Sequence, residues 1–300
     1  MKKVSNKILL TLLIALICSI SYAQKSPIQT IHKIEEVTNR YKELSSLNSE
    51  ERNEYSALDT ISFPTDMYNR YAQALTMSKP VYLTSSQVDF LVNAVEFPAN
   101  SSEQTRAELD FLLELQKNRT EEQTERVMDL AHIGYWPEVN ILKSHPKYQK
   151  NLDDLFFELK EVVGEKASAA NYPFTAKLLQ GIMNDMRLME FAVKYHLLRP
   201  RPYILETKLE PLQIMGSPSF ASGHTLWAYI QAYTLSELIP EKREGFIALA
   251  YELGMSREIM GVHYPSDEEI ARQLAHRMVE LMWHTEKFQK DFKRAKEEWK

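Results

Sequence analysis

The chain has 300 residues, with 36 lysines and arginines, 41 aspartates and glutamates, and a formal net charge of −5. This acidic balance argues against a general nucleic-acid-binding protein, because binding to a phosphate backbone requires a basic surface. Beyond the N-terminal segment, no stretch approaches the roughly eighteen apolar residues that indicate a membrane span. No integral span is therefore expected in the processed chain.

The segment 1–23 has the pattern of a signal peptide. Lys2, Lys3 and Lys7 precede an apolar stretch over residues 8–20, and Ala23 offers a small residue for cleavage before Gln24. Cleavage there would remove these lysines and no acidic residue, so the formal charge would change from −5 to −8. It would also remove the only cysteine, Cys18. We therefore expect a secreted, periplasmic protein that depends on a packed core and not on disulfides.

Apolar residues recur at spacings of three and four along most of the chain, and valine-rich runs of alternating polarity are missing. This pattern predicts an all-α fold. We expect a helical N-terminal extension over residues 24–96, acting as a cover or a lid, and a catalytic domain over residues 97–300. Ser266 and Glu269 have the spacing of a capping box and are expected to start a helix. The other expected helices cover residues 28–47, 86–95, 102–116, 120–133, 152–163, 174–198, 222–239, 241–261 and 288–299.

Three polar clusters lie in the second half of the chain: KYHLLRPRP, FASGH and SREIMGVHYPSD. They contribute three cations from separate points in the sequence, Lys194, Arg201 and Arg257. Arginine grips phosphate oxygens through two donors and lysine supplies a mobile point charge, so the three together can neutralise a phosphate dianion. Each cation alone is more commonly a solvated surface charge. Their combination is what predicts a phosphate site.

Ser222, Gly223 and His224 stand at the expected start of a helix. A hydroxyl, an unhindered backbone N–H and the positive end of a helix dipole together form an anion site. The alternative for this triplet alone is an ordinary serine helix cap. His224, beside the anion, would donate a proton to a leaving alcohol and later take one from an attacking water.

His263 and Asp267 complete the candidate site. An aspartate bonded to one imidazole nitrogen fixes the tautomer and leaves the other nitrogen free to attack phosphorus, which would give a phosphohistidine. The alternative is a loop histidine capped by an acid. The other six histidines show no metal-ligand spacing, and the three cations supply the charge that a metal would. We therefore expect no metal and no other cofactor.

Together the clusters resemble the three-part signature of the phosphatidic acid phosphatase type 2 superfamily, which also contains vanadium haloperoxidases and bacterial class A non-specific acid phosphatases. The similarity is closest to the class A acid phosphatases and covers roughly residues 97–300. It implies an all-helical bundle with the site at one end. The family usually has proline where this chain has Ala221. By position, the resemblance implies phosphate binding by Lys194, Arg201, Ser222, Gly223 and Arg257, a general acid at His224, a nucleophile at His263 and an orienting carboxylate at Asp267.

We therefore expect a secreted, metal-independent acid phosphatase that acts on small phosphomonoesters. Mildly acidic pH should favour it, because His224 must be protonated while His263 is neutral. Three alternatives stay open: a haloperoxidase that holds vanadate in the same cage, a lipid-phosphate phosphatase or phosphotransferase, and a non-catalytic helical phosphate-binding protein. The sequence also leaves open whether the protein is a homo-oligomer.

Overall fold

The computed structural model describes residues 39–137 and 143–300, and every regular element within these ranges is a helix. The predicted all-α fold class is confirmed for this part of the chain. The predicted signal peptide and most of the helix expected over residues 28–47 lie outside the described residues. Among the helices that are described, none combines the length and the apolar character needed to cross a bilayer.

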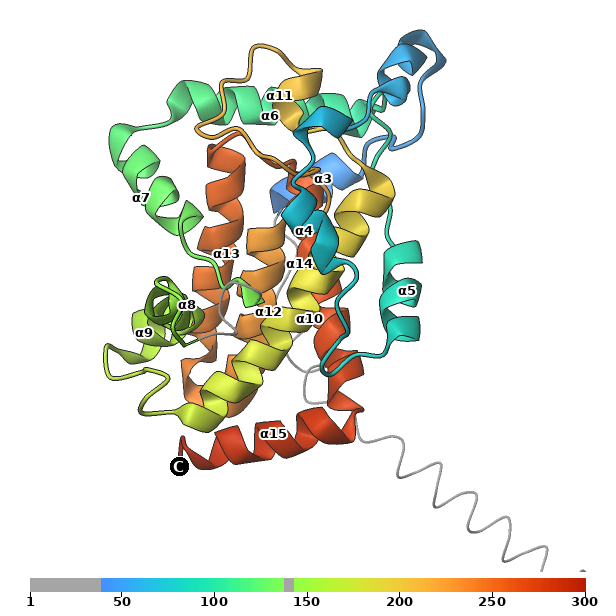
Figure 1. Ribbon diagram of the computed structural model, residues 1–300. Coiled ribbons are helices and arrows are strands. Elements are labelled where there is room, and N and C mark those ends of the chain that lie inside the picture. Colours follow the sequence, from blue (N-terminus) through green and yellow to red (C-terminus); the bar gives the residue numbers. More distant parts are fainter. Residues whose placement is uncertain (1–38, 138–142) are drawn as a thin grey trace, which may run out of the picture.

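Four long helices form the centre of the molecule: α10 (Pro173–Leu197), α12 (Gly223–Leu238), α13 (Arg243–Ile259) and α14 (Pro265–Trp283). Helix α12 packs against the other three (Figure 1). Nearly all of its side chains are buried. A helix that is apolar on all sides has no solvent face and is stable only when other helices surround it. The sequence of α12 therefore explains its central position.

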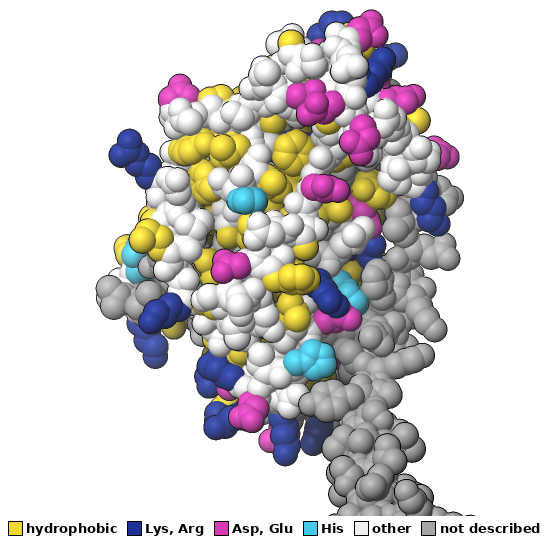
Figure 2. All heavy atoms as spheres, turned by 90° about the vertical axis from the view of Figure 1, so that its right-hand side faces the viewer, with side chains coloured by type: hydrophobic (Ala, Val, Ile, Leu, Met, Phe, Trp, Pro, Cys, Tyr) yellow, Lys and Arg dark blue, Asp and Glu magenta, His cyan; other side chains and the backbone are white. Residues whose placement is uncertain are grey.

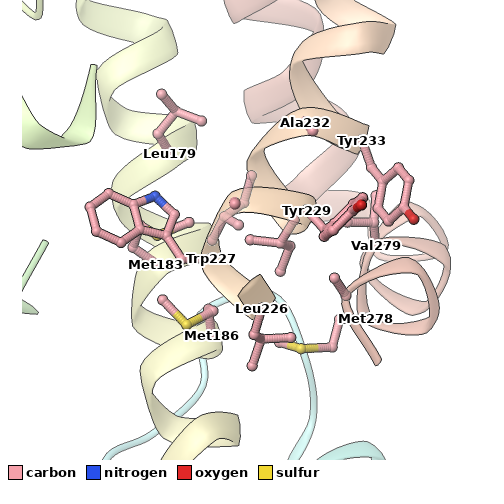
Figure 3. Packing of buried hydrophobic residues seen from close by; sticks show 14 of the residues in the cluster. Leu179, Met183, Met186, Leu226, Trp227, Tyr229, Ala232, Tyr233, Met278 and Val279 are labelled. Atoms are coloured by element: carbon pink, nitrogen blue, oxygen red, sulfur yellow. The ribbon is translucent and has the colours of Figure 1, made fainter. Parts of the chain in front are cut away.

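The core between these helices is built from aliphatic, methionine and aromatic side chains (Figure 3). Leu179, Met183 and Met186 of α10 pack around Leu226 and Trp227 at the start of α12. Interiors of proteins are close-packed, so this contact fixes the relative position of the two helix ends. On the opposite side of α12, Met278 and Val279 of α14 complete the layer.

Shorter helices enclose this centre. Helix α6 lies across one end of the bundle and α15 across the other (Figure 1). The polar stretch before residue 120 separates α6 from α7, as the sequence predicts. The bounds of the outer helices are Glu103–Asn118 for α6, Glu121–Ala131 for α7, Tyr148–Leu155 for α8, Phe157–Val163 for α9, Pro202–Leu205 for α11 and Glu286–Glu297 for α15.

Two predicted helix details are wrong. The helix expected over residues 152–163 is two helices, α8 and α9, which meet at the fully buried Phe156. The capping box expected at Ser266 and Glu269 does not form, because α14 already begins at Pro265 and the Ser266 hydroxyl donates instead to Glu108 of α6, at 2.8 Å. In both cases a tertiary contact overrides a local preference.

Residues 39–96 pack on the bundle through short elements: α3 (Asn39–Ser45), the 3₁₀ helices η1 (Asn53–Thr60) and η2 (Thr65–Met67), α4 (Arg70–Leu75) and α5 (Ser85–Asn93). The carboxylate of Asp185, on α10, accepts from the backbone N–H groups of Val81, Tyr82 and Leu83 at 2.5, 2.8 and 2.7 Å. Tyr82 also packs edge-on against Phe288 of α15. Residues on both sides of the predicted boundary at 96/97 thus share one core.

The segment 39–96 leaves some apolar side chains exposed to solvent on the α5 side of the molecule. Apolar side chains are visible there among acidic and uncharged ones (Figure 2). Phe90 of α5 is 58% exposed, whereas Val88 and Leu91 on the same helix are buried. One face of α5 is therefore fixed to the core and the other faces outward.

Candidate active site

The C-terminal end of α10, the start of α12, the end of α13 and the loop before α14 meet at a cavity of about 650 Å³. Six of the eight residues singled out in the sequence line it. The other two, Ser222 and Asp267, are fully buried behind its wall. The structure therefore brings together groups that lie far apart in the chain. The six lining residues are Lys194, Arg201, Gly223, His224, Arg257 and His263.

His263 is held from both sides of its ring. Nδ1 lies 3.0 Å from Oδ2 of Asp267, and Nε2 lies 2.9 Å from Nη1 of Arg201. A guanidinium can only donate, so Nε2 is the acceptor and the ring proton is on Nδ1. Burial, and then the charge of Arg201, lower the pKa of His263 well below its usual range. The ring is therefore neutral in mild acid. The lone pair of Nε2 points toward Arg201, and both residues line the cavity.

Asp267 is held by four groups. Oδ1 accepts from Nη1 of Arg199 at 2.6 Å, and Oδ2 accepts from the Ser219 hydroxyl at 2.5 Å and from the Tyr264 backbone N–H at 3.1 Å, in addition to His263. Burial acts to raise its pKa, but Arg199 and the bonded His263 hold the pKa well below the usual range. Asp267 is therefore an ionised, immobile partner for the imidazole.

Arg199 was not singled out by the sequence, although it lies in the same cluster as Arg201. Its side chain is fully buried, stacks over the Tyr264 ring at 3.8 Å and also reaches Oε2 of Glu108 at 3.4 Å. It does not line the cavity. The two arginines of the Arg-Pro-Arg-Pro run thus have different roles, one facing the cavity and one facing Asp267.

The three predicted cations differ in how many of their N–H donors have a hydrogen-bond partner within the protein. Lys194 Nζ donates to the carbonyls of Pro218 and Ser219 at 2.8 and 2.9 Å, and burial beside Arg201 lowers its pKa to about 7. Arg257 donates through Nη1 to the Met260 sulfur, whereas its buried Nε and Nη2 have no hydrogen-bond partner in the described part of the chain. Buried donors are rarely left unpaired, so these two N–H groups are suited to an anion in the cavity.

The turn into α12 supplies the remaining groups. The Ser222 hydroxyl donates to Oγ1 of Thr225 at 3.1 Å and accepts from the Thr225 backbone N–H at 3.5 Å, which makes it a helix cap. Gly223 is the first residue of the helix, and its N–H has no intrahelical acceptor. Of the two alternatives that the sequence left open, the structure shows the helix cap at Ser222, and an anion site at the Gly223 N–H stays a prediction.

His224 faces the cavity with Nε2 3.3 Å from the carbonyl of Ala131, at the end of α7. A carbonyl only accepts, so this nitrogen carries a proton. Burial, followed by the charges of Arg257 and Arg187, lowers the pKa of His224 well below its usual range. A negative ligand in the cavity would oppose that effect and favour the protonated ring.

The cavity residues that the sequence did not single out include Arg187 and Glu190, both on α10 before Lys194. Spacings of three, four and seven residues place all three on one helix face, and this spacing could have identified them. Within residues 39–137 and 143–300, no cluster of three or more His, Cys, Asp or Glu side chains could hold a metal ion.

Part of the chain is similar to a known protein family. Residues 171–290, two fifths of the chain, match the family model described as the PAP2 superfamily. All eight residues singled out in the sequence lie within the matched range.

The similar curated proteins are phosphatases. The chain is 32% identical over 145 residues to a non-specific acid phosphatase of Providencia stuartii, covering 46% of this chain and 58% of that protein. It is 26% identical over 171 residues to a non-specific acid phosphatase of Salmonella typhi, covering 52% and 68%. A shorter match, 51% identical over 51 residues, joins it to a lipid A 1-phosphatase of Rhizobium etli, covering 16% and 21%. The chain thus spans little more than half the length of the first of these relatives.

Two solved structures share parts of the architecture. One is a bacterial vanadium-dependent iodoperoxidase, with a TM-score of 0.45 and 14% identity over 64% of this chain and 51% of that one. The other is a transmembrane PAP2-type phosphatidylglycerolphosphate phosphatase from Bacillus subtilis, with a TM-score of 0.42 and 20% identity over 71% and 94%.

Proposed function

We propose that the protein is a metal-independent acid phosphatase that hydrolyses small phosphomonoesters through a phosphohistidine. The observation that carries the proposal is the environment of His263. Its Nε2 accepts a hydrogen bond from a buried cation of the cavity, and its Nδ1 is bonded to a buried, ionised carboxylate. A neutral imidazole in this arrangement is a nucleophile next to a site for a phosphoryl group.

Binding of the substrate places its phosphoryl group among the cations. The free Nε and Nη2 donors of Arg257, the ammonium of Lys194 and the N–H of Gly223 surround the position beside His263. Phosphoryl transfer spreads negative charge over the equatorial oxygens, and fixed cations stabilise that charge without reorganising. The same cations neutralise the ground state, so tight inhibition by inorganic phosphate is expected.

In the first chemical step, Nη1 of Arg201 exchanges its hydrogen bond to Nε2 of His263 for one to a phosphoryl oxygen. The freed Nε2 lone pair forms a bond to phosphorus while the ester P–O bond breaks. The leaving alkoxide takes a proton from the His224 imidazolium. In the second step, water attacks the phosphohistidine, His224 takes a proton from that water, and the P–N bond breaks with its electron pair returning to Nε2. Asp267 holds the Nδ1 proton of His263 throughout and stabilises the positive charge that develops on the ring.

The electrostatics of the cavity support an acidic optimum. His263 must be neutral to attack, and its lowered pKa keeps it neutral below pH 6.5. His224 must be protonated to act as an acid, and its lowered pKa means that this form is lost early as the pH rises. Activity should therefore decline toward neutral and alkaline pH. The basic and apolar start of the sequence supports secretion into the periplasm.

Hydrolysis of p-nitrophenyl phosphate between about pH 4 and 9, with chelator present, tests the proposal. His263→Ala should abolish turnover, and His284→Ala, at a position outside the cavity, should leave it unchanged. Rapid quenching of the wild type should trap one acid-labile phosphoryl group per chain, which His263→Ala cannot form. Absence of turnover in folded protein would overturn the proposal, and halide oxidation after vanadate loading would then identify the haloperoxidase alternative.

A further inference from the structure

Glu190 places a carboxylate inside the cation-lined cavity. It lies on α10 one turn before Lys194, is 6% exposed and lines the cavity. Oε2 accepts from Nη1 of Arg187 at 2.7 Å. Oε1 lies directly over Gly223, so close that a β-carbon at position 223 would be 1.9 Å from it. The carboxylate is therefore at the start of α12, next to the N–H group assigned to the phosphate.

The cations that act on Glu190 come from α10, from the segment after it and from α13. Its carboxylate interacts electrostatically with Lys194, Arg201 and Arg257. Only Oε2 accepts a hydrogen bond from a described residue, and that donor is Arg187. The charged and titratable groups that line this cavity or act on the Glu190 carboxylate are Tyr71 on α4, His132 after α7, Lys147, Lys150 and Asp154 at α8, Arg187, Lys194 and Tyr195 on α10, Arg201 after it, His224 on α12, Arg257 on α13 and His263 before α14.

A carboxylate in an anion site limits which anions fit. Ionised carboxylate and phosphate oxygens are all acceptors, so a dianion placed against Oε1 meets repulsion with no proton to share. The monoanion of a phosphomonoester carries one P–OH group, which can donate to Oε1. Sulfate carries no proton at these pH values and cannot make this bond. The carboxylate thus converts a general anion site into one that recognises a protonated oxyanion.

We propose that Glu190 is a specificity-determining residue that accepts a hydrogen bond from a protonated phosphate oxygen, so that the site selects phosphomonoester monoanions and inorganic phosphate monoanion over sulfate and over dianions. This inference rests on the proposed function, because it requires the phosphate site beside His263. It adds a second cause for acidic activity. The second pKa of a phosphomonoester is about 6, so the monoanion is depleted roughly tenfold for each pH unit above that value, independently of the histidines.

Binding of two inorganic anions, without turnover, tests this role. Isothermal titration of the full chain with phosphate and with sulfate at about pH 5.5 should show phosphate bound at least tenfold more tightly, the least expected for a hydrogen bond to a charged group. Phosphate affinity should fall as the pH rises through the second pKa of phosphate. In Glu190→Gln the amide can donate as well as accept, so sulfate should bind about as tightly as phosphate and the pH dependence should be lost.

Asp154→Asn is the matched control. Asp154 also lines the cavity, but it is paired with Lys150 at 2.6 Å, and the three atoms nearest to a β-carbon at position 223 all belong to Glu190. This variant should keep the wild-type preference. If Glu190→Gln does not fold, Glu190→Asp keeps the acceptor and should keep phosphate ahead of sulfate, with lower affinity because the shorter side chain reaches less far.

The outcomes separate the two proposals. Equal binding of sulfate and phosphate to the wild type, or an unchanged preference in Glu190→Gln, overturns the role of Glu190 and leaves the phosphatase proposal in place. Failure of the wild type to bind either anion, with no difference between it and Arg257→Ala, overturns the phosphate site itself. Tighter binding of dianionic phosphate at alkaline pH in the wild type would also contradict the inference.

Discussion

Arg199 donates through Nη1 to Oδ1 of Asp267 at 2.6 Å, and neither side chain is exposed to solvent. The same guanidinium reaches Oε2 of Glu108 on α6 at 3.4 Å. A continuous line of buried polar groups therefore connects the imidazole of His263 to a helix that precedes the segment matched by the PAP2 family model. Breaking a buried ion pair by removing one partner is strongly destabilising, so each member of this line supports the others.

Replacement of Arg199 should impair catalysis without touching substrate. In Arg199→Gln, Asp267 loses its charged partner, its pKa rises toward the usual range and His263 is less firmly oriented. We expect kcat to fall roughly 100-fold, as for a small misplacement of a reacting group, with KM changed much less. The acid limb of the pH–rate profile should also move to higher pH, because Asp267 is protonated earlier as the pH falls.

Two control variants show whether the effect is specific to the charge of Arg199. Arg277→Gln removes an exposed arginine that pairs with Glu280 on the surface of α14, and should change neither kcat nor the profile. Arg199→Lys keeps the charge and should recover part of kcat. A loss of stability in Arg199→Gln with an unshifted acid limb would show that Arg199 is purely structural.

Ser222→Ala should show whether the Ser222 hydroxyl caps the helix or binds phosphate. The hydroxyl is engaged by Thr225 and does not line the cavity, so its loss should lower the free energy of unfolding by about 1 kcal/mol, measured by chemical denaturation. Inhibition by phosphate should change less than about tenfold, a smaller effect than loss of a hydrogen bond to a charged ligand. Thr285→Ala, the cap of α15, is the control for stability alone. A larger effect on phosphate would assign the hydroxyl to the ligand.

Gly223→Ala should be destabilising because of one specific neighbour. The new methyl group would overlap Oε1 of Glu190, which is held in place by Arg187. The same substitution in a Glu190→Ala background should cost much less, which gives a coupling free energy of roughly 1 kcal/mol or more between the two positions. Additive costs in a double-mutant cycle would mean that Glu190 moves aside freely.

Glu158 on α9 should make stability depend on pH. Burial raises its pKa to about 8, and its Oε2 accepts from Gln231 at 2.9 Å. The folded-state pKa exceeds the unfolded value of about 4.3, so the stability from this group is complete below that value and is lost as the pH rises to about 8.

Glu158→Gln removes this dependence. An amide at this position can also donate to the unpaired Oε1 of Gln231. The variant should therefore melt at a higher temperature than the wild type near pH 8, with little difference near pH 5. Equal melting temperatures at both pH values would contradict a protonated Glu158 in the folded protein.

Apolar periodicity predicted the helices. Six of the eight residues that the sequence singled out for their chemistry line one cavity, and their role in catalysis stays a prediction. The sequence could not separate Arg199 from Arg201. Leu198, just before Arg199, adopts a left-handed conformation with φ of 54°, and the chain turns there into the segment that directs the two side chains to different sides. Nor could local preference anticipate that Ser266 would bond to Glu108, a partner far away in the chain. Glu190 could have been predicted from the sequence, because it lies one helical turn before Lys194 on the same helix.

The hydrogen bonds from the N–H groups of residues 81–83 to Asp185 also limit which segments can be exchanged with a relative in a chimeric protein. A chimera that exchanges the segment before residue 97 but keeps α10 would leave the buried Asp185 carboxylate without donors unless the new backbone follows the same path over residues 81–83. It would also replace the Tyr82 ring that packs against Phe288. The segment and α10 should therefore be exchanged together, as one cassette, and α15 should accompany them.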